Sequence, residues 1–189
     1  MTIKIALMGH ARSGKDTFAK PLITGNSDEL PLLTEIKFAS PISSIIEEYF
    51  PEQEGKPREL YQKIGQSMRE IDPDVWVNYL DDVYHWNENS HHRMTKGIIL
   101  TDVRQPNEWQ WCREQGFTVV KIDCPLELRI ERAMAAGDQF NVGDMFHETE
   151  QYIDQLPADI TVTNVGSVGE LETKAWQLCN MLLKEDKDD

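Results

Sequence analysis

The chain has 189 residues, of which 40% are hydrophobic and 28% charged, so it is long enough for one well-packed globular domain and short for two. Its 33 acidic residues against 19 basic ones give a formal net charge of −14, which argues against extended binding to DNA or RNA and against docking on an anionic membrane. No apolar run approaches the roughly 18 residues that a membrane-spanning helix needs.

The opening stretch MTIKIALMGH lacks the basic flank and the cleavage site of a secretory signal, and its pattern is that of a strand. The three cysteines, Cys112, Cys124 and Cys179, are widely spaced and form no CxxC pair, so neither a zinc site nor a disulfide framework is predicted. We therefore expect free thiols in a reducing cytoplasm.

Short apolar, β-branched runs alternate with longer segments of helical pattern. Near-continuous apolar strands separated by helices indicate a parallel sheet covered on both faces, so we predict a three-layer α/β fold in a single domain, residues 1–189. The predicted strands are 3–8, 35–39, 97–101, 118–122 and 159–163. The predicted helices are 14–24, 41–50, 57–71, 74–85, 105–115, 126–136, 148–155 and 167–184.

The segment GHARSGKDT, residues 9–17, follows the first predicted strand and opens the first predicted helix. It matches G-x-x-x-x-G-K, the pattern of a phosphate-binding loop. Glycines let the backbone approach a polyphosphate closely, and amide N–H groups converge at the helix N-terminus. The candidate ATP-binding residues are Gly9, Arg12, Ser13, Gly14, Lys15, Asp16 and Thr17, with Lys15 reaching the β- and γ-phosphates.

Asp16 stands where this pattern usually has a serine or threonine that binds Mg²⁺. A carboxylate is a suitable hard-oxygen ligand, so Asp16 could hold the ion directly or through water, and Thr17 could supply the hydroxyl instead. A third interpretation is that Asp16 is only a negative charge favoured by the dipole at the start of the helix.

Asp102 and Arg104 follow the third predicted strand. In doubly wound sheets ligands bind beyond the carboxyl ends of the strands, where Asp102 would suit the water shell of Mg²⁺ or the orientation of an acceptor phosphate. Arg104 could clamp that acceptor. The alternative is a structural salt bridge between the two side chains.

Five segments together, GHARSGKDT, KFASPI, MREIDPDVWV, TDVRQPNEW and the late NVG, resemble deoxynucleoside monophosphate kinases of the bacteriophage type. The resemblance covers nearly the whole chain in order. It implies an NMP-kinase-like P-loop fold with a five-stranded parallel core, an acceptor-binding insert at about 40–95 and a lid at about 125–147. It also implies that Arg69, Asp102 and Arg104 face the acceptor phosphate, and Trp76 is a candidate for the pocket that holds the base.

Kinases of this kind close arginines over the transferring phosphoryl group, because its transition state spreads negative charge over the equatorial oxygens. From Ala133 to Thr173 the chain has no lysine or arginine. The lid arginines are therefore expected to be Arg129 and Arg132, three residues apart on one helix face, with a solvated pair as the alternative. Lys15, Asp102, Arg129 and Arg132 are the predicted catalytic residues.

Asn164, in the NVG segment after the fifth predicted strand, resembles the loop that contacts adenine in NMP kinases, and a simple turn is the alternative. The resemblance implies transfer of the γ-phosphoryl group of ATP, with Mg²⁺, to a (deoxy)nucleoside monophosphate. A kinase for another phosphate ester, of the dephospho-CoA or phosphomevalonate type, and a P-loop regulatory module without kinase activity are the rivals. The expected partners are small nucleotides, with no nucleic-acid polymer and no membrane, and a homodimer is left open.

Overall fold

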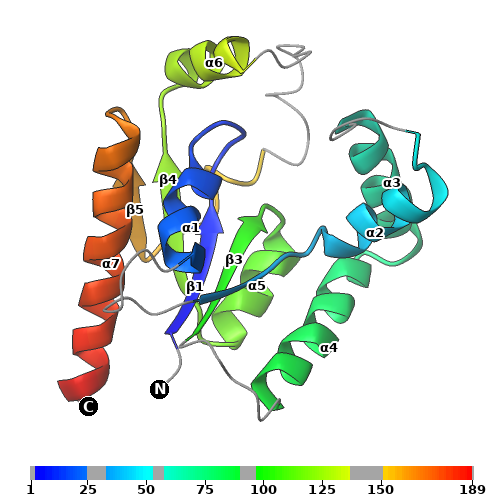
Figure 1. Cartoon of the computed structure of the whole chain (residues 1–189). Coiled ribbons are helices and arrows are strands. Elements are labelled where there is room, and N and C mark those ends of the chain that lie inside the picture. Colours follow the sequence, from blue (N-terminus) through cyan, green and yellow to red (C-terminus); the bar gives the residue numbers. More distant parts are fainter. Residues whose placement is uncertain (1–2, 25–32, 53–57, 90–96, 137–150, 189) are drawn as a thin grey trace. The chain divides into compact units, whose positions relative to one another are not determined.

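The computed structural model describes residues 3–24, 33–52, 58–89, 97–136 and 151–188 (Figure 1). The chain divides into two compact units, the first made of residues 1–35 and 94–189 and the second of residues 36–93. The predicted insert at about 40–95 stays a prediction, and residues 137–147 of the predicted lid lie outside the described residues.

A five-stranded sheet with the order β2-β3-β1-β4-β5 forms the centre of the first unit. The central strand β1 pairs in parallel with β3 and β4, and β4 pairs in parallel with β5. The predicted α/β class with a five-stranded parallel sheet is confirmed. The strands are β1 (Ile3–Met8), β2 (Leu33–Ile36), β3 (Gly97–Val103), β4 (Thr118–Asp123) and β5 (Ile160–Thr163).

The second strand begins two residues earlier than the predicted range of 35–39 and ends at Ile36. Leu33 is 2% exposed and belongs to the core cluster, so burial of this side chain extends the strand toward its start. Since the segment thus starts earlier, Glu35 lies near the end of the strand rather than at its beginning.

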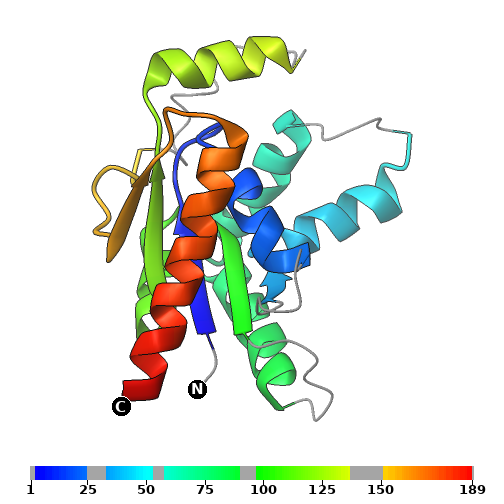
Figure 2. The ribbon, with the colours of Figure 1, turned by 60° about the vertical axis from the view of Figure 1, so that its left-hand side comes forward.

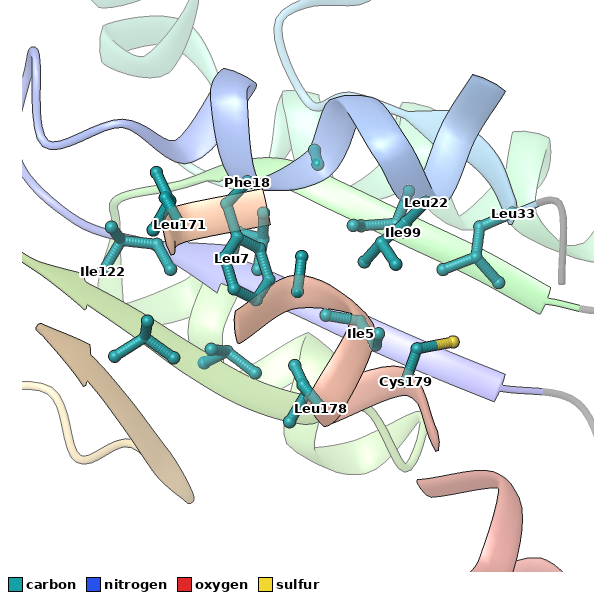
Figure 3. Packing of buried hydrophobic residues seen from close by; sticks show 14 of the residues in the cluster. Ile5, Leu7, Phe18, Leu22, Leu33, Ile99, Ile122, Leu171, Leu178 and Cys179 are labelled. Atoms are coloured by element: carbon teal, nitrogen blue, oxygen red, sulfur yellow. The ribbon is translucent and has the colours of Figure 1, made fainter. Parts of the chain in front are cut away.

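Helices α1 (Lys15–Thr24) and α7 (Val168–Asp188) lie side by side on one face of the sheet (Figures 1 and 2). Their apolar side chains meet those of the strands in one core, in which Leu7, Phe18 and Leu171 are packed together (Figure 3). Helix α5 (Pro106–Glu114) covers the opposite face, where Trp111 and Cys112 are buried. Helix α6 (Leu126–Ala135) follows β4.

The second unit is built from the helices α2 (Ser40–Tyr49), α3 (Arg58–Ile71) and α4 (Val75–Asn89). Proline in the first turn of α2 is favoured because its missing N–H would have no partner there. The hydroxyl of Tyr61 donates to Ser43 Oγ at 3.0 Å, and this contact ties α3 to α2.

One predicted helix, 148–155, is wrong over the residues that the structure describes, because residues 151–155 form turns; residues 148–150 lie outside the description. The amides of Gln155 and Leu156 both bond to the carbonyl oxygen of Tyr152, which closes a single turn. Pro157 then ends it, since proline disfavours helical backbone at the preceding residue. In the described part of the chain, no helix has the length and apolarity needed to cross a membrane.

The core packing predicts the cost of a cavity in β1. Leu7 is fully buried, so Leu7→Ala should lower the free energy of unfolding by about 2–5 kcal/mol, measured by urea denaturation. Val165 is 58% exposed, and Val165→Ala should change that free energy by less than about 0.5 kcal/mol. Equal effects of the two substitutions would contradict the packing described here.

Candidate functional site

The loop between β1 and α1 has a backbone that two glycines make possible. Gly9 and Gly14 adopt positive φ angles of 154° and 103°. A Cβ atom on Gly9 would lie 2.6 Å from the carbonyl oxygen of Ile122, and one on Gly14 would lie 2.4 Å from Asn164 Nδ2. Both glycines are thus required by the protein's own packing, before any ligand is considered.

The side chain of Lys15 is hydrogen-bonded to the backbone of this loop. Its side chain is 8% exposed, and its Nζ donates hydrogen bonds to the carbonyl oxygens of Gly9 at 2.5 Å and His10 at 3.1 Å. The amide of Ser13 bonds to the His10 carbonyl at 3.1 Å, and the amide of Phe18 bonds to the Gly14 carbonyl at 2.9 Å as α1 begins. The first amides of a helix have no partner within it, so this loop presents donors and an ammonium group together.

Arg12 is the one non-glycine residue of the described chain with a positive φ, 63°. Such a backbone costs a residue with a side chain about 1–2 kcal/mol, and strain of this kind clusters at functional sites. Ser13 is 1% exposed, and its Oγ has no hydrogen-bond partner among the described residues. The loop therefore holds two features that packing alone does not explain.

The metal-binding prediction falls on the first turn of α1. Asp16 is exposed and Thr17 is half-buried, directly after the buried Lys15. A carboxylate and a hydroxyl are hard-oxygen donors of the kind that Mg²⁺ prefers, so the donor set fits the ion. The choice between the two residues stays a prediction.

The carboxyl end of β3 is irregular where it passes β1. Ala6 pairs with Leu100 and Met8 with Val103, so the single residue Leu7 stands opposite both Thr101 and Asp102. Such a bulge redirects side chains and is common beside active sites. Asp102 is half-buried at this point.

Glu35 is a candidate that the sequence interpretation missed. Its Oε1 accepts a hydrogen bond of 2.7 Å from the hydroxyl of Thr101, which is 2% exposed. The carboxylate therefore stands beside the strand end that carries Asp102. A prediction that started the second strand at Leu33 would have placed Glu35 near the end of that strand, where ligands bind, and so would have suggested Glu35 as a site residue.

Glu108 stabilises the turn formed by the second half of the segment TDVRQPNEW. Glu108 is 3% exposed, and its carboxylate accepts hydrogen bonds from the amides of Arg104 at 2.8 Å and Gln105 at 3.0 Å. Pro106 then begins α5. Proline and glutamate thus fix the turn on which the half-buried Arg104 lies.

Two acidic groups, the buried Glu108 and the half-buried Asp102, act on Cys112 of α5. Burial is the main cause that raises the pKa of the Cys112 thiol far above its usual value, and the carboxylates of Glu108 and Asp102 raise it further. Asp102 therefore lies close to α5, and the Cys112 thiol is kept protonated and unreactive.

The two arginines of α6 have different surroundings. Arg132 donates to Cys124 Sγ at 3.2 Å and to the backbone oxygen and Oδ1 of Asn164 at 3.3 and 3.4 Å. Arg129 is 8% exposed, yet no group among the described residues accepts a hydrogen bond from its Nε or Nη1. Burial raises the pKa of the Cys124 thiol, while the positive charges of Arg132 and Arg129 act in the opposite direction, so both guanidinium groups lie near it.

Asn164 connects Arg132 to the phosphate-binding loop. It is 4% exposed, and its Nδ2 donates to the carbonyl oxygen of Ser13 at 2.8 Å. Its own amide donates to the Asp123 carbonyl at 2.7 Å. The predicted contact with adenine stays a prediction, and the structure gives the side chain a different set of partners.

His10 takes part in a contact that no sequence pattern indicated. Its Nε2 lies 3.1 Å from Asp154 Oδ2, and Lys121 donates to Asp154 Oδ1 at 2.8 Å. The hydrogen bond from Lys121 is the main cause that lowers the pKa of Asp154, and His10 adds to it. Because His10 and Asp154 are 144 positions apart, only the fold brings them together.

Arg69 and Trp76 lie in the second unit, on α3 and α4. Trp76 is 4% exposed, and its Nε1 donates to the Gly65 carbonyl at 3.2 Å, so its ring packs inside that unit. Arg69 is half-buried beside Gly65. Their roles in acceptor binding stay predictions.

No protein-family model matches the chain. The deoxynucleoside-5'-monophosphate kinase of Escherichia phage T5 is 35% identical over 88 residues, which cover 42% of this chain and only 35% of that protein. The resemblance seen in the motifs is confirmed by this relative.

Several solved structures with the same fold are kinases by name. They include shikimate kinase from Bacteroides thetaiotaomicron, with a TM-score of 0.56 and 16% identity over 95% of this chain and 98% of that one. A sugar kinase from Janibacter has a TM-score of 0.55 and 18% identity, covering 94% of both chains. The APS kinase of Mycobacterium tuberculosis has a TM-score of 0.53 and 12% identity, covering 96% and 99%. These likenesses establish the fold.

The packing of Asn164 on the loop gives a stability prediction. Gly14→Ala should lower the midpoint of thermal unfolding more than Gly116→Ala does. Both glycines have positive φ angles, 103° and 74°, but a Cβ on Gly116 would meet no atom within 4 Å. Gly116→Ala should cost about 1 kcal/mol through the backbone alone. In Gly14→Ala the new Cβ would also collide with Asn164. Equal falls of the unfolding midpoint in the two variants would contradict this packing of Asn164 on the loop.

Proposed function

We propose that the chain transfers the γ-phosphoryl group of ATP to a small phosphate ester, with a (deoxy)nucleoside monophosphate as the acceptor. The observation that carries the proposal is the buried ammonium of Lys15, folded over a glycine loop at the start of α1. A polyphosphate would replace the neutral carbonyl oxygens of Gly9 and His10 with charged partners, and such charge-assisted bonds are stronger.

Mg²⁺ fits the first turn of α1, where Asp16 or Thr17 would hold it next to Lys15. When bound, the ion neutralises charge on the β- and γ-phosphates. The chain's own residues bind and orient the two substrates and exclude water, so transfer is direct and in line, without a covalent enzyme intermediate.

Arg129 is proposed as the arginine that meets the transferring phosphoryl group. The Nε and Nη1 of the buried Arg129 have no acceptor among the described residues, which is costly for a cation, and a bound anion would supply those bonds. Arg132 was also predicted to be catalytic, but its bonds to Cys124 and Asn164 favour Arg129 for direct contact with the substrate.

Two observations support a (deoxy)nucleoside monophosphate as the acceptor. The phage T5 relative is a deoxynucleoside monophosphate kinase by name, and the bulged end of β3 carries Asp102 and Arg104 beside the central strand. Asp102 would orient the attacking phosphate oxygen, and Arg104 would bind the acceptor phosphate. In the second unit, Arg69 is proposed for the acceptor phosphate and Trp76 for the base. The three free, buried cysteines are compatible with a reducing compartment.

Removal of the loop ammonium tests the nucleotide site. Lys15→Ala should lower kcat by about 100-fold or more, because the charge that binds the β- and γ-phosphates is lost. Lys20→Ala removes an exposed lysine of the same helix and should leave the rate unchanged. Release of ADP in the presence of a monophosphate acceptor is the measurement, and near-normal transfer by Lys15→Ala would show that the site is misassigned.

A panel of acceptors tests the proposed substrate class. Deoxy- and ribonucleoside monophosphates should be phosphorylated, with formation of the diphosphate followed by chromatography. Transfer only to dephospho-CoA or phosphomevalonate would show that the acceptor is not a nucleotide. Binding or hydrolysis of ATP that no acceptor stimulates would favour a regulatory module.

Arg129 should make opposite contributions to stability and to activity. Arg129→Met removes a buried charge whose Nε and Nη1 have no acceptor in the described part of the chain, so it should raise the free energy of unfolding of the ligand-free protein by about 1–3 kcal/mol. The same substitution should lower kcat by about 100-fold, measured with ATP and the best acceptor.

Arg113→Met is the matched control. Arg113 is paired with Asp159 at 2.6 Å and half-exposed, so its loss should lower stability by at most about 1 kcal/mol and leave kcat unchanged. A destabilised Arg129→Met variant with normal turnover would reject the role of Arg129.

A further inference from the structure

We infer that Asn164 is a positioning residue for the phosphate-binding loop, and that Arg132 acts through it. The inference rests on the proposed function, because it assigns the work of Asn164 to the loop that would bind the triphosphate of ATP. The observation is a continuous series of hydrogen bonds from Arg132 on α6, through the side chain of Asn164, to the carbonyl oxygen of Ser13.

The bond to Ser13 fixes the orientation of one peptide plane. In a trans peptide the carbonyl and the N–H of the next residue point in opposite directions. Asn164 Nδ2 holds the Ser13 carbonyl at 2.8 Å, so the amide of Gly14 faces away from Asn164. Gly14 has a φ of 103° and no side chain of its own to restrict rotation of this plane. The amide is thereby held in one direction before an anion arrives.

Arg132 fixes the Asn164 side chain in turn. A guanidinium only donates hydrogen bonds, so the amide oxygen of Asn164 must face Arg132 and its NH₂ group must face Ser13. Arg132 also holds the backbone oxygen of Asn164 at 3.3 Å, and Asp123 accepts from its amide at 2.7 Å. All polar groups of Asn164 are thus engaged with the protein, in a side chain that is 4% exposed.

This arrangement separates two explanations of Asn164. A residue that contacts adenine would affect nucleotides according to their base, and would not affect a ligand that has no base. A residue that orients the loop would affect every ligand with a polyphosphate equally. Magnesium tripolyphosphate, which has the phosphates of ATP and no nucleoside, is therefore the decisive probe.

The test is Asn164→Asp in the full chain. The new side chain has nearly the same shape but cannot donate to the Ser13 carbonyl. Calorimetric Kd values for MgATP, MgGTP and magnesium tripolyphosphate should all rise by the same factor, about 10- to 100-fold. The KM for ATP should rise with them while the KM for the acceptor stays within about twofold. Equal affinities in the variant and the wild type, or a loss confined to MgATP, would overturn the inference.

Lys174→Met is the matched control, because Lys174 donates to the backbone oxygen of Thr163 at 2.6 Å, one residue before Asn164, without a bond to the phosphate-binding loop. It should leave all three Kd values unchanged. Asn164→Ser, whose side chain is too short to reach Ser13, replaces the aspartate variant if that one unfolds. A fall in thermal stability without any change in tripolyphosphate affinity would make Asn164 a structural residue and reject the positioning role.

A double-mutant cycle with Arg132→Gln separates the two roles of that arginine. If Arg132 acts through Asn164, the double variant should bind tripolyphosphate no more weakly than the weaker single variant. Additive losses would mean that Arg132 contacts the phosphates itself, and would overturn the second part of the inference. A wild-type protein that binds none of the three ligands would contradict the proposed function, whereas binding that Asn164→Asp leaves intact would contradict only the positioning role.

Discussion

The hydrogen bonds between the Lys15 ammonium and the carbonyl oxygens of Gly9 and His10 are the interaction on which the site depends. Lys15 is 8% exposed, so its ammonium group needs acceptors, and the loop's own carbonyls supply them. Because these acceptors are neutral, a polyphosphate can compete for the same charge. The loop is thus formed without a ligand and keeps the chemistry that a ligand would use.

Around this loop the protein retains groups that a purely structural sequence would avoid. Arg129 is buried with no acceptor for its Nε or Nη1 in the described structure, Ser13 Oγ has no partner there, and Arg12 has a strained backbone. Each lowers stability, and the strands and the helices α1 and α7 compensate with a continuous apolar core. The net charge of −14 does not prevent anion binding, since distant charges are screened and the local groups are cationic.

Segments that lie far from the loop in the sequence are joined to it by polar contacts. Asn164 reaches Ser13 across 151 positions, and Asp154 reaches His10 across 144. The carboxyl end of β4 holds Asn164 in turn, since the Asp123 carbonyl accepts from the amide of Asn164. The loop is therefore packed into the first unit by residues that are remote from the motif in sequence.

Sequence alone determined the α/β class, the order of strands and helices along the chain, and the glycine loop with Lys15, because periodicity and glycine spacing are local signals. It misplaced the second strand and so missed Glu35, and it predicted a helix where Pro157 permits only a turn. Only the tertiary structure distinguished Arg129 from Arg132 and paired Asn164 with Ser13. The two arginines differ in burial and in their contacts with distant residues, which their three-residue spacing on one helix cannot reveal. The contact of Asn164 with Ser13 likewise joins residues that are distant in the sequence.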